Sequence, residues 1–133
     1  MPLDALCLTA VAAEIRAAVQ GGKIDKIYQP TRDEVVLYIR GPAGNVRLLL
    51  SANPGHPRAH LTERNRENPE QPPMFCMLLR KHLQGARILE LNQPPLERIL
   101  DFNLETLDEL GDRVERRLVL EAMGRRSNLI LLD

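Results

Sequence analysis

The first stretch of the chain carries the hydrophobic period of a helix. Its apolar residues recur at helical spacing and make one buried face, at Leu6, Val11, Ile15, Ala18 and Val19. Asp4 can cap the start of this helix, because its carboxylate accepts hydrogen bonds from free backbone N–H groups. Gly21-Gly22 ends it, since glycine tolerates the left-handed conformation. The pattern predicts a helix over residues 4–20.

The next stretch changes to the period of a strand. Residues 23–28 are typical of a short strand, and residues 34–40 alternate more clearly between the two faces of a sheet. Residues 41–45, Gly-Pro-Ala-Gly-Asn, predict a turn. Residues 46–51 then return as the second strand of a hairpin.

Prolines break regular structure between residues 52 and 73, where we expect a long surface loop with a brief strand over residues 59–62. Pro72-Pro73 then opens a second helix, over residues 74–84, because the missing N–H of proline would be unpaired there anyway. Gly85 ends it. Its expected apolar face is Phe75, Leu78, Leu79 and Leu83. Its last turn is basic, with Arg80, Lys81 and His82.

The last third of the chain is rich in strands. We expect them at residues 88–91, 98–104, 114–123 and 129–132, with a turn over residues 124–127. Two helices and about seven short strands indicate an α+β domain built on antiparallel sheets. The predicted fold is therefore a β-sandwich-like core flanked by helices.

Length and composition indicate one globular domain with a modest core, spanning residues 1–133, because the chain is 44% hydrophobic. No apolar run approaches the roughly 20 residues that a membrane span needs. Residues 1–9 carry no basic cluster ahead of an apolar stretch, and Asp4 interrupts them, which argues against a signal peptide. We therefore expect a cytoplasmic protein with no membrane partner. Cys7 and Cys76 form no CxxC pair and are expected to be structural thiols.

The net charge is zero, so bulk charge does not indicate a nucleic-acid binder. Fifteen of the eighteen basic residues are arginine, which suits bidentate recognition of phosphate. Genomic base composition explains the same excess of arginine. The local grouping of arginines therefore has to decide between phosphate recognition and base composition.

Catalytic patterns are largely missing from the sequence. It has no GxSxG, HExxH or GxxxxGK[ST] motif, and His56, His60 and His82 lack metal-ligand spacing with the cysteines. We therefore expect no enzyme, no cofactor and no metal site. One alternative stays open at Pro2, whose secondary amine could form an iminium with an aldehydic carbon, as in Fpg/MutM-type DNA glycosylases. The glycosylase pattern continues with an acid and a second proline, whereas Leu3 follows here.

Three stretches of the chain form a recognisable set. They are GGKIDKIYQP at residues 21–30, PPMFCMLLRKHL at residues 72–83 and EAMGRRSNLILLD at residues 121–133. Their order and spacing resemble the N-terminal domain of the NFACT family, the RqcH-like ribosome quality-control proteins, also called fibronectin-binding protein A-like. The likeness covers nearly the whole chain.

The resemblance implies a bacterial homologue of NEMF and a part of a longer multidomain protein. Such proteins bind large ribosomal subunits obstructed by a stalled peptidyl-tRNA. They recruit tRNA, alanine tRNA in bacteria, and support template-free C-terminal tailing of the nascent chain. The resemblance also implies a fold like the Fpg/MutM N-terminal domain without its catalysis. The older family name keeps a fibronectin-binding adhesin as a further alternative.

The resemblance also implies RNA-binding residues. The family's tRNA-handling Asp-Arg pair falls on Glu97 and Arg98, so the acid here is one methylene longer. The family's GRHSN turn reads GRRSN here, with Arg125 conserved in type and Arg126 in place of histidine. This turn could equally be a plain hairpin turn. The complete expected RNA-binding set is Glu97, Arg98, Arg125, Arg126, Arg80 and Lys81.

Overall fold

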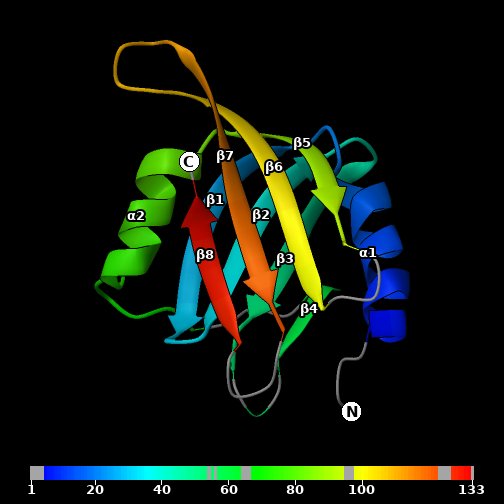
Figure 1. Ribbon diagram of the computed structural model, residues 1–133. Helices are drawn as coiled ribbons and strands as arrows, with labels where there is room; N and C mark the ends of the chain where they lie inside the picture. Colours follow the sequence, from blue (N-terminus) through cyan, green and yellow to red (C-terminus); the bar gives the residue numbers. More distant parts are fainter. Residues whose placement is uncertain are drawn as a thin grey trace.

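The computed structural model describes residues 5–53, 55, 57–63, 67–94, 98–122 and 127–132. Within these residues the chain forms two helices and eight strands (Figure 1). In chain order they are α1 (Ala5–Val19), β1 (Lys23–Thr31), β2 (Glu34–Gly41), β3 (Gly44–Ser51), β4 (Arg58–Thr62), α2 (Met74–Leu83), β5 (Arg87–Asn92), β6 (Ile99–Leu107), β7 (Arg113–Glu121) and β8 (Asn128–Leu132).

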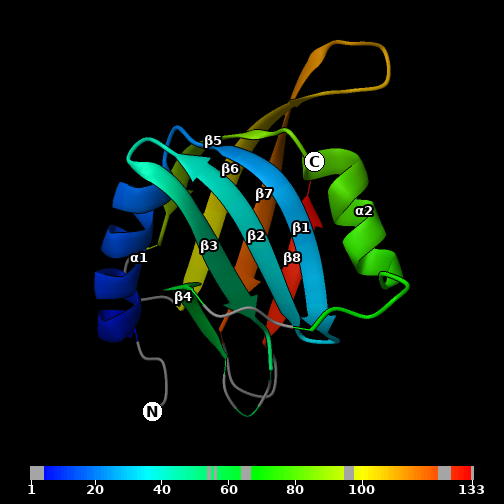
Figure 2. The ribbon, with the colours of Figure 1, turned by 180° about the vertical axis from the view of Figure 1, so that it is seen from behind.

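The strands form one antiparallel sheet in the order β4-β3-β2-β1-β5-β6-β7-β8. Among the described strands, the two halves are paired with each other through β1 and β5, where Lys23 pairs with Arg87. The half made of β5 to β8 lies in front of the half made of β1 to β4 in Figure 1, and behind it in Figure 2. The sheet thus folds over on itself. The prediction of an antiparallel α+β domain with two helices is confirmed, whereas the likeness to Fpg/MutM-type domains stays a prediction.

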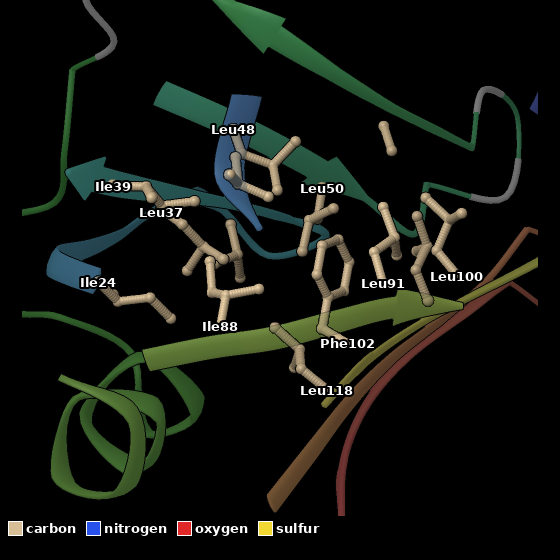
Figure 3. Packing of buried hydrophobic residues seen from close by; sticks show 14 of the residues in the cluster. Ile24, Leu37, Ile39, Leu48, Leu50, Ile88, Leu91, Leu100, Phe102 and Leu118 are labelled. Carbon is tan, nitrogen blue, oxygen red and sulfur yellow. The ribbon is translucent and has the colours of Figure 1, made fainter. Parts of the chain in front are cut away.

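The core fills the space between the two halves of the sheet. In Figure 3 the side chains of Leu48 and Leu50 on β3 point toward those of Ile88 on β5 and Phe102 on β6. All four are at most 1% exposed. Fully burying a side chain of this size stabilises the fold by roughly 1.5–3 kcal/mol. Each half of the sheet therefore depends on the other for the burial of its inner face.

Helix α1 covers one open side of the sandwich, where it contacts β2, β3, β4 and β5. Its buried face is Leu8, Ala12, Ile15 and Val19. Ile15 and Val19 confirm the prediction, Leu8 and Ala12 were missed, and Val11 and Ala18 pack at the edge of the core. Asp4, the expected cap, lies outside the described residues.

The end of α1 packs tightly on the β2–β3 hairpin. Gly21 ends the helix with φ +86°, as the Gly21-Gly22 pair predicts. At Gly41 a Cβ atom would lie 2.2 Å from the carbonyl oxygen of Ala18. The helix can approach this strand only because the position carries no side chain.

Helix α2 covers the opposite side, against β1 and β6. It follows Pro73 as predicted, but its buried residues are Cys76, Leu79 and Leu83. The expected apolar face is therefore wrong at Leu78, which is 43% exposed. The helix faces the sheet with Cys76, Leu79 and Leu83, and this orientation leaves Leu78 toward solvent.

The predicted strands are all present, and several are longer than expected. Strand β1 continues to Thr31 across register shifts, and β6 continues to Leu107. The β6–β7 hairpin consequently projects beyond the body of the domain (Figure 1). Its turn is closed by Asp108, whose Oδ1 accepts hydrogen bonds from the backbone N–H groups of Leu110 and Asp112, each at 2.9 Å.

Candidate nucleic-acid interface

One end of the sandwich collects the end of β1, the start of β2, the start of β6, the end of β7 and the start of β8 (Figure 1, lower end). We call it the Arg98 end. Arg98 precedes β6, and its backbone carbonyl accepts a hydrogen bond from Ala122 N–H at 2.8 Å. Its side chain is exposed. Glu97, Arg125 and Arg126 lie outside the described residues.

Two further arginines lie at this end in different environments. Arg32, in the β1–β2 turn, is exposed. Arg58, at the start of β4, donates to Glu34 Oε2 at 3.1 Å, and Glu34 also accepts from Thr31 Oγ1 at 3.0 Å. The Glu34 side chain is only 10% exposed. Arg58 is therefore held against the sheet, whereas Arg32 and Arg98 extend into solvent.

The two basic residues predicted on α2 lie elsewhere. Arg80 Nε donates to the backbone carbonyl of Ile27 at 2.8 Å. Lys81 Nζ lies 3.6 Å from Glu109 Oε1 in the β6–β7 turn, which projects from the opposite end of the sandwich. The structure thus places Arg98 at one end, Arg80 on the side and Lys81 toward the other end, and does not bring them together. Their roles in RNA binding stay predictions.

Arg80 belongs to a row of two aromatic rings flanked by two cations, which sequence reasoning missed. Its guanidinium lies 5.4 Å from the ring centre of Tyr28, and the Tyr28 and Tyr38 rings meet edge to face at 5.0 Å. Arg47 lies 4.8 Å over the ring of Tyr38. The register of β1, β2 and β3 brings Tyr28, Tyr38 and Arg47 together, and the packing of α2 on β1 adds Arg80.

The outer faces of the two half-sheets differ in charge. On β1 to β4 the outward positions hold more basic than acidic residues: Lys23, Lys26, Arg40, Arg47 and Arg58 against Asp25 and Glu34. On β5 to β8 the order is reversed: Arg87, Arg113 and Arg117 against Glu90, Asp101, Glu105, Glu115 and Glu121. A chain with zero net charge is therefore polarised across its thickness.

The basic face also carries a shallow groove of about 740 Å³. Lys26, Tyr38 and Arg47 line it from three adjacent strands, because Tyr38 pairs with both of the others. Asp25 at its edge forms an ion pair with Arg40 at 3.2 Å. Cations beside an aromatic ring can contact the phosphates of a nucleic acid while the ring stacks on a base, and they repel a metal cation.

The described residues offer little for covalent or metal chemistry. Among them, no group of His, Cys, Asp or Glu side chains could hold a metal ion. Cys76 is buried, and its Sγ donates to the Ile27 carbonyl at 3.6 Å. Burial raises the pKa of the Cys76 thiol more strongly than neighbouring Arg80 lowers it, so the thiol stays neutral and unreactive near neutral pH. No helix in the described ranges is long and apolar enough to cross a bilayer.

Comparisons with known proteins agree on one family. The profile of a family described as NFACT N-terminal and middle domains matches residues 4–133. The Rqc2 homolog RqcH of Bacillus subtilis is 44% identical over 133 residues, which is all of this chain and 23% of that protein. The human ribosome quality control complex subunit NEMF is 29% identical over 126 residues, 95% of this chain and 11% of NEMF. The chain thus spans about a quarter or less of these relatives.

Solved structures match almost the whole chain. The N-terminal part of the fibronectin/fibrinogen-binding protein of Streptococcus suis aligns with a TM-score of 0.95 at 44% identity, covering 98% of this chain and 49% of that chain. The fibrinogen-binding protein of Staphylococcus aureus aligns with a TM-score of 0.86 at 35% identity, covering 98% of this chain and 46% of that chain. The folded sandwich and its two helices are therefore shared with these domains.

Proposed function

Because this chain belongs to the NFACT N-terminal family, whose relatives are named ribosome quality-control proteins, we propose that it is the tRNA- and ribosome-binding module of such a factor. The module acts by binding and not by catalysis. In the full-length protein it holds a tRNA, alanine tRNA in bacteria, on a large ribosomal subunit that carries a stalled peptidyl-tRNA. It thereby supports template-free alanine tailing of the nascent chain in the cytoplasm.

The observation that carries this proposal is the position of Arg98. Ala122 directly follows β7 and precedes the segment with Arg125 and Arg126 in the sequence, and its N–H donates to the Arg98 carbonyl at 2.8 Å. Arg98 therefore lies beside Ala122, a few residues before Arg125 and Arg126 in the sequence. A guanidinium offers a planar fork for a phosphate or a base edge. We expect Arg98 and the Arg125-Arg126 pair to contact the same RNA.

Glu97 supplies the complementary chemistry in this proposal. A carboxylate can accept hydrogen bonds from base amino groups or from a ribose hydroxyl, or it can hold Arg98 in place. The glutamate is one methylene longer than the family's aspartate, but it carries the same charge. We therefore expect the pair to act on RNA as a unit.

The test is to place Arg98→Ala in the full-length protein. We expect it to lose tRNA recruitment while its thermal melt and its binding to large ribosomal subunits stay largely unchanged, because the Arg98 side chain is exposed. Glu97→Asp should be tolerated and Glu97→Ala should not. The measurement is the tRNA recovered with the purified protein. Arg113→Ala, an exposed arginine in the distant β6–β7 hairpin, is the matched control. Normal tRNA recovery by Arg98→Ala, with an unchanged melt, would show that the pair has no such role.

A second candidate function comes from the solved relatives, which are described as fibronectin- or fibrinogen-binding proteins. The same purified protein should therefore be titrated with fibronectin and with abasic DNA alongside tRNA. The abasic DNA tests a glycosylase that uses Pro2, which lies outside the described residues. Affinity for tRNA well above the other two supports the proposed function. The reverse order supports an adhesin or a DNA-binding domain.

A further inference from the structure

The exposed apolar side chains of the domain gather on one side. Among the described residues, the large hydrophobic side chains that are exposed lie on helix α2, on the β6–β7 hairpin and at the end of β8. They are Met74, Met77, Leu78, Leu107, Leu110 and Leu132, between 40% and 88% exposed. Exposed apolar residues scattered singly are normal, whereas a group of them on one side indicates an interaction surface. We call this side the α2 flank.

On α2 the exposed apolar side chains form one stripe. Met77 and Leu78 follow Met74 by three and four residues, so the three side chains lie on the same face of the helix. The face that packs on the sheet is a different one, centred on Leu79. The helix is therefore apolar on two faces, and within the described part of the chain only one of them is covered. A helix that is apolar all round is normally buried all round.

The stripe continues toward the β6–β7 hairpin. A groove of about 520 Å³ lies between the last turn of α2 and this hairpin, and Leu107 and Leu110 line it. Its charged lining residues are Lys81 and Arg116 against Asp108 and Glu109. An RNA backbone needs a cationic surface, and here the charges balance. The α2 flank therefore suits a protein surface, unlike the Arg98 end.

Strand β8 adds an apolar sheet edge to the same flank. At the Arg98 end, Phe75 of α2 and Ser127 beside β8 line one cavity of about 330 Å³, together with Gln29. The other end of β8 lies beside the last turns of α2 (Figures 1 and 2). β8 is the outermost strand of the sheet, and residues 129–132, Leu-Ile-Leu-Leu, carry no charge and no proline. Such an edge needs a cover, because its outward N–H and C=O groups can pair with another chain.

We propose that the α2 flank is the docking face for the part of the full-length protein that follows residue 133. The chain spans less than half of the solved relatives' chains, so these proteins contain at least as much polypeptide again. In a longer protein of this family the polypeptide leaves the domain at the end of β8, within the flank itself. The segment that follows is therefore tethered beside the apolar stripe at a high effective concentration. An apolar face on that segment covers the stripe and the edge of β8 together.

The experiment measures how fast the two methionines of the stripe are oxidised in the purified full-length protein. Hydrogen peroxide transfers one oxygen atom to an accessible methionine sulfur and leaves as water, and mass spectrometry reports the sulfoxide at each site. Within this domain Met74 is 88% and Met77 is 57% exposed, so they are shielded only if something docks on the flank. The reference rate is that of the same protein unfolded in urea. Oxidation is followed over a range of protein concentrations.

Two substitutions place a charge in the flank. Leu78→Glu changes the stripe, and Leu110→Glu changes the β6–β7 turn. The Leu110 side chain is 87% exposed, so its substitution provides a second variant if Leu78→Glu does not fold. Ala13→Glu, at an exposed position of α1 on the opposite side of the sandwich, is the matched control. A thermal melt of each variant confirms that the protein is folded.

We expect Met74 and Met77 to oxidise about tenfold more slowly in the folded protein than in urea, as for a face that opens about a tenth of the time. This protection should hold at every protein concentration. Leu78→Glu and Leu110→Glu should restore most of the unfolded rate, whereas Ala13→Glu should not.

Three results overturn this inference. Oxidation of the folded wild type at the unfolded rate means that the flank is open in the full-length protein. Protection that disappears on dilution assigns the flank to contact between two copies of the protein. Protection that survives both substitutions, or that Ala13→Glu relieves equally, means that the flank is not its cause. No RNA takes part in these measurements, so each result leaves the proposed function standing.

Discussion

At the scale of single residues, the environment of each arginine decides what it can bind. Arg58 is held by Glu34 at 3.1 Å, and Arg80 is held by the Ile27 carbonyl at 2.8 Å. Arg32 and Arg98 are exposed at the same end of the sandwich. Some arginines therefore stabilise the fold through contacts within the domain, whereas others are exposed and can reach a ligand. Composition alone could not make this division.

Cys76 gives a pH-dependent prediction at the same scale. Burial raises the pKa of its thiol, so the folded state keeps the proton to higher pH than the unfolded state does. The stabilisation is complete below the pKa of an unfolded thiol, roughly 8.5, and is lost as pH rises toward the folded pKa. In this window the free energy of unfolding should fall by at most about 1.4 kcal/mol per pH unit.

The measurement is urea unfolding of the wild type and of Cys76→Ala between neutral and alkaline pH. Every other titrating group, including Cys7, is common to both proteins. The wild type should therefore lose stability faster than the variant as pH rises. Parallel pH profiles would mean that the folded state does not perturb this thiol.

At the scale of elements, helix α2 runs from the Arg98 end toward the β6–β7 turn and is attached to the sheet by its last turn. Phe75 lines the cavity at the Arg98 end, whereas Lys81 meets the β6–β7 turn. Next to Lys81, Arg80 donates a hydrogen bond to the Ile27 carbonyl on β1 and lies 5.4 Å from the ring centre of Tyr28. Arg80 thus attaches the last turn of the helix to the sheet. This attachment helps to hold Phe75 at the lining of the cavity.

Arg80→Ala should therefore destabilise the domain by about 1–3 kcal/mol, because it removes a charge-assisted hydrogen bond and a cation–π contact. Arg80→Lys should recover only part of this loss, since an ammonium cannot reproduce the planar contact with the ring. Denaturant midpoints provide the measurement. Lys81→Ala, next to it but 62% exposed in its side chain, should change stability by less than about 0.5 kcal/mol. Equal stability of Arg80→Ala and wild type would assign Arg80 to the surface.

At the scale of the whole molecule, zero net charge conceals a division between a more basic and a more acidic outer face. The basic face belongs to β1 to β4 and the acidic face to β5 to β8. An RNA at the Arg98 end would be attracted toward the first and repelled by the second. The orientation of the domain on a tRNA is therefore expected to follow this division.

The salt dependence of binding tests the contribution of Arg125 to such a contact. If this residue meets a phosphate, Arg125→Ala in the full-length protein should weaken RNA binding similarly across sequences. It should also reduce the slope of log affinity against log salt by roughly 1, because one fewer counterion is released. Filter binding over a range of salt concentrations measures both effects. An unchanged slope with intact folding would leave only a hairpin turn at this position.

The sequence by itself determined the elements of this fold. The change from a helical to an alternating period located both helices and every strand, including β4, because local backbone geometry dictates those periods. Gly21 and Pro73 marked helix ends for equally local reasons. The three family stretches, likewise read from the sequence, identified the family that the comparisons later matched.

Only the tertiary structure decided how these elements use their side chains. Leu78 is exposed, against the prediction, and Cys76 is buried, because the sheet beneath α2 decides which face of the helix packs inward. The contact between Tyr28 and Tyr38, and the meeting of Gln29, Phe75 and Ser127, depend on strand register and on the fold of the sheet over itself. These are contacts between residues far apart in the chain, and local periodicity carries no information about them.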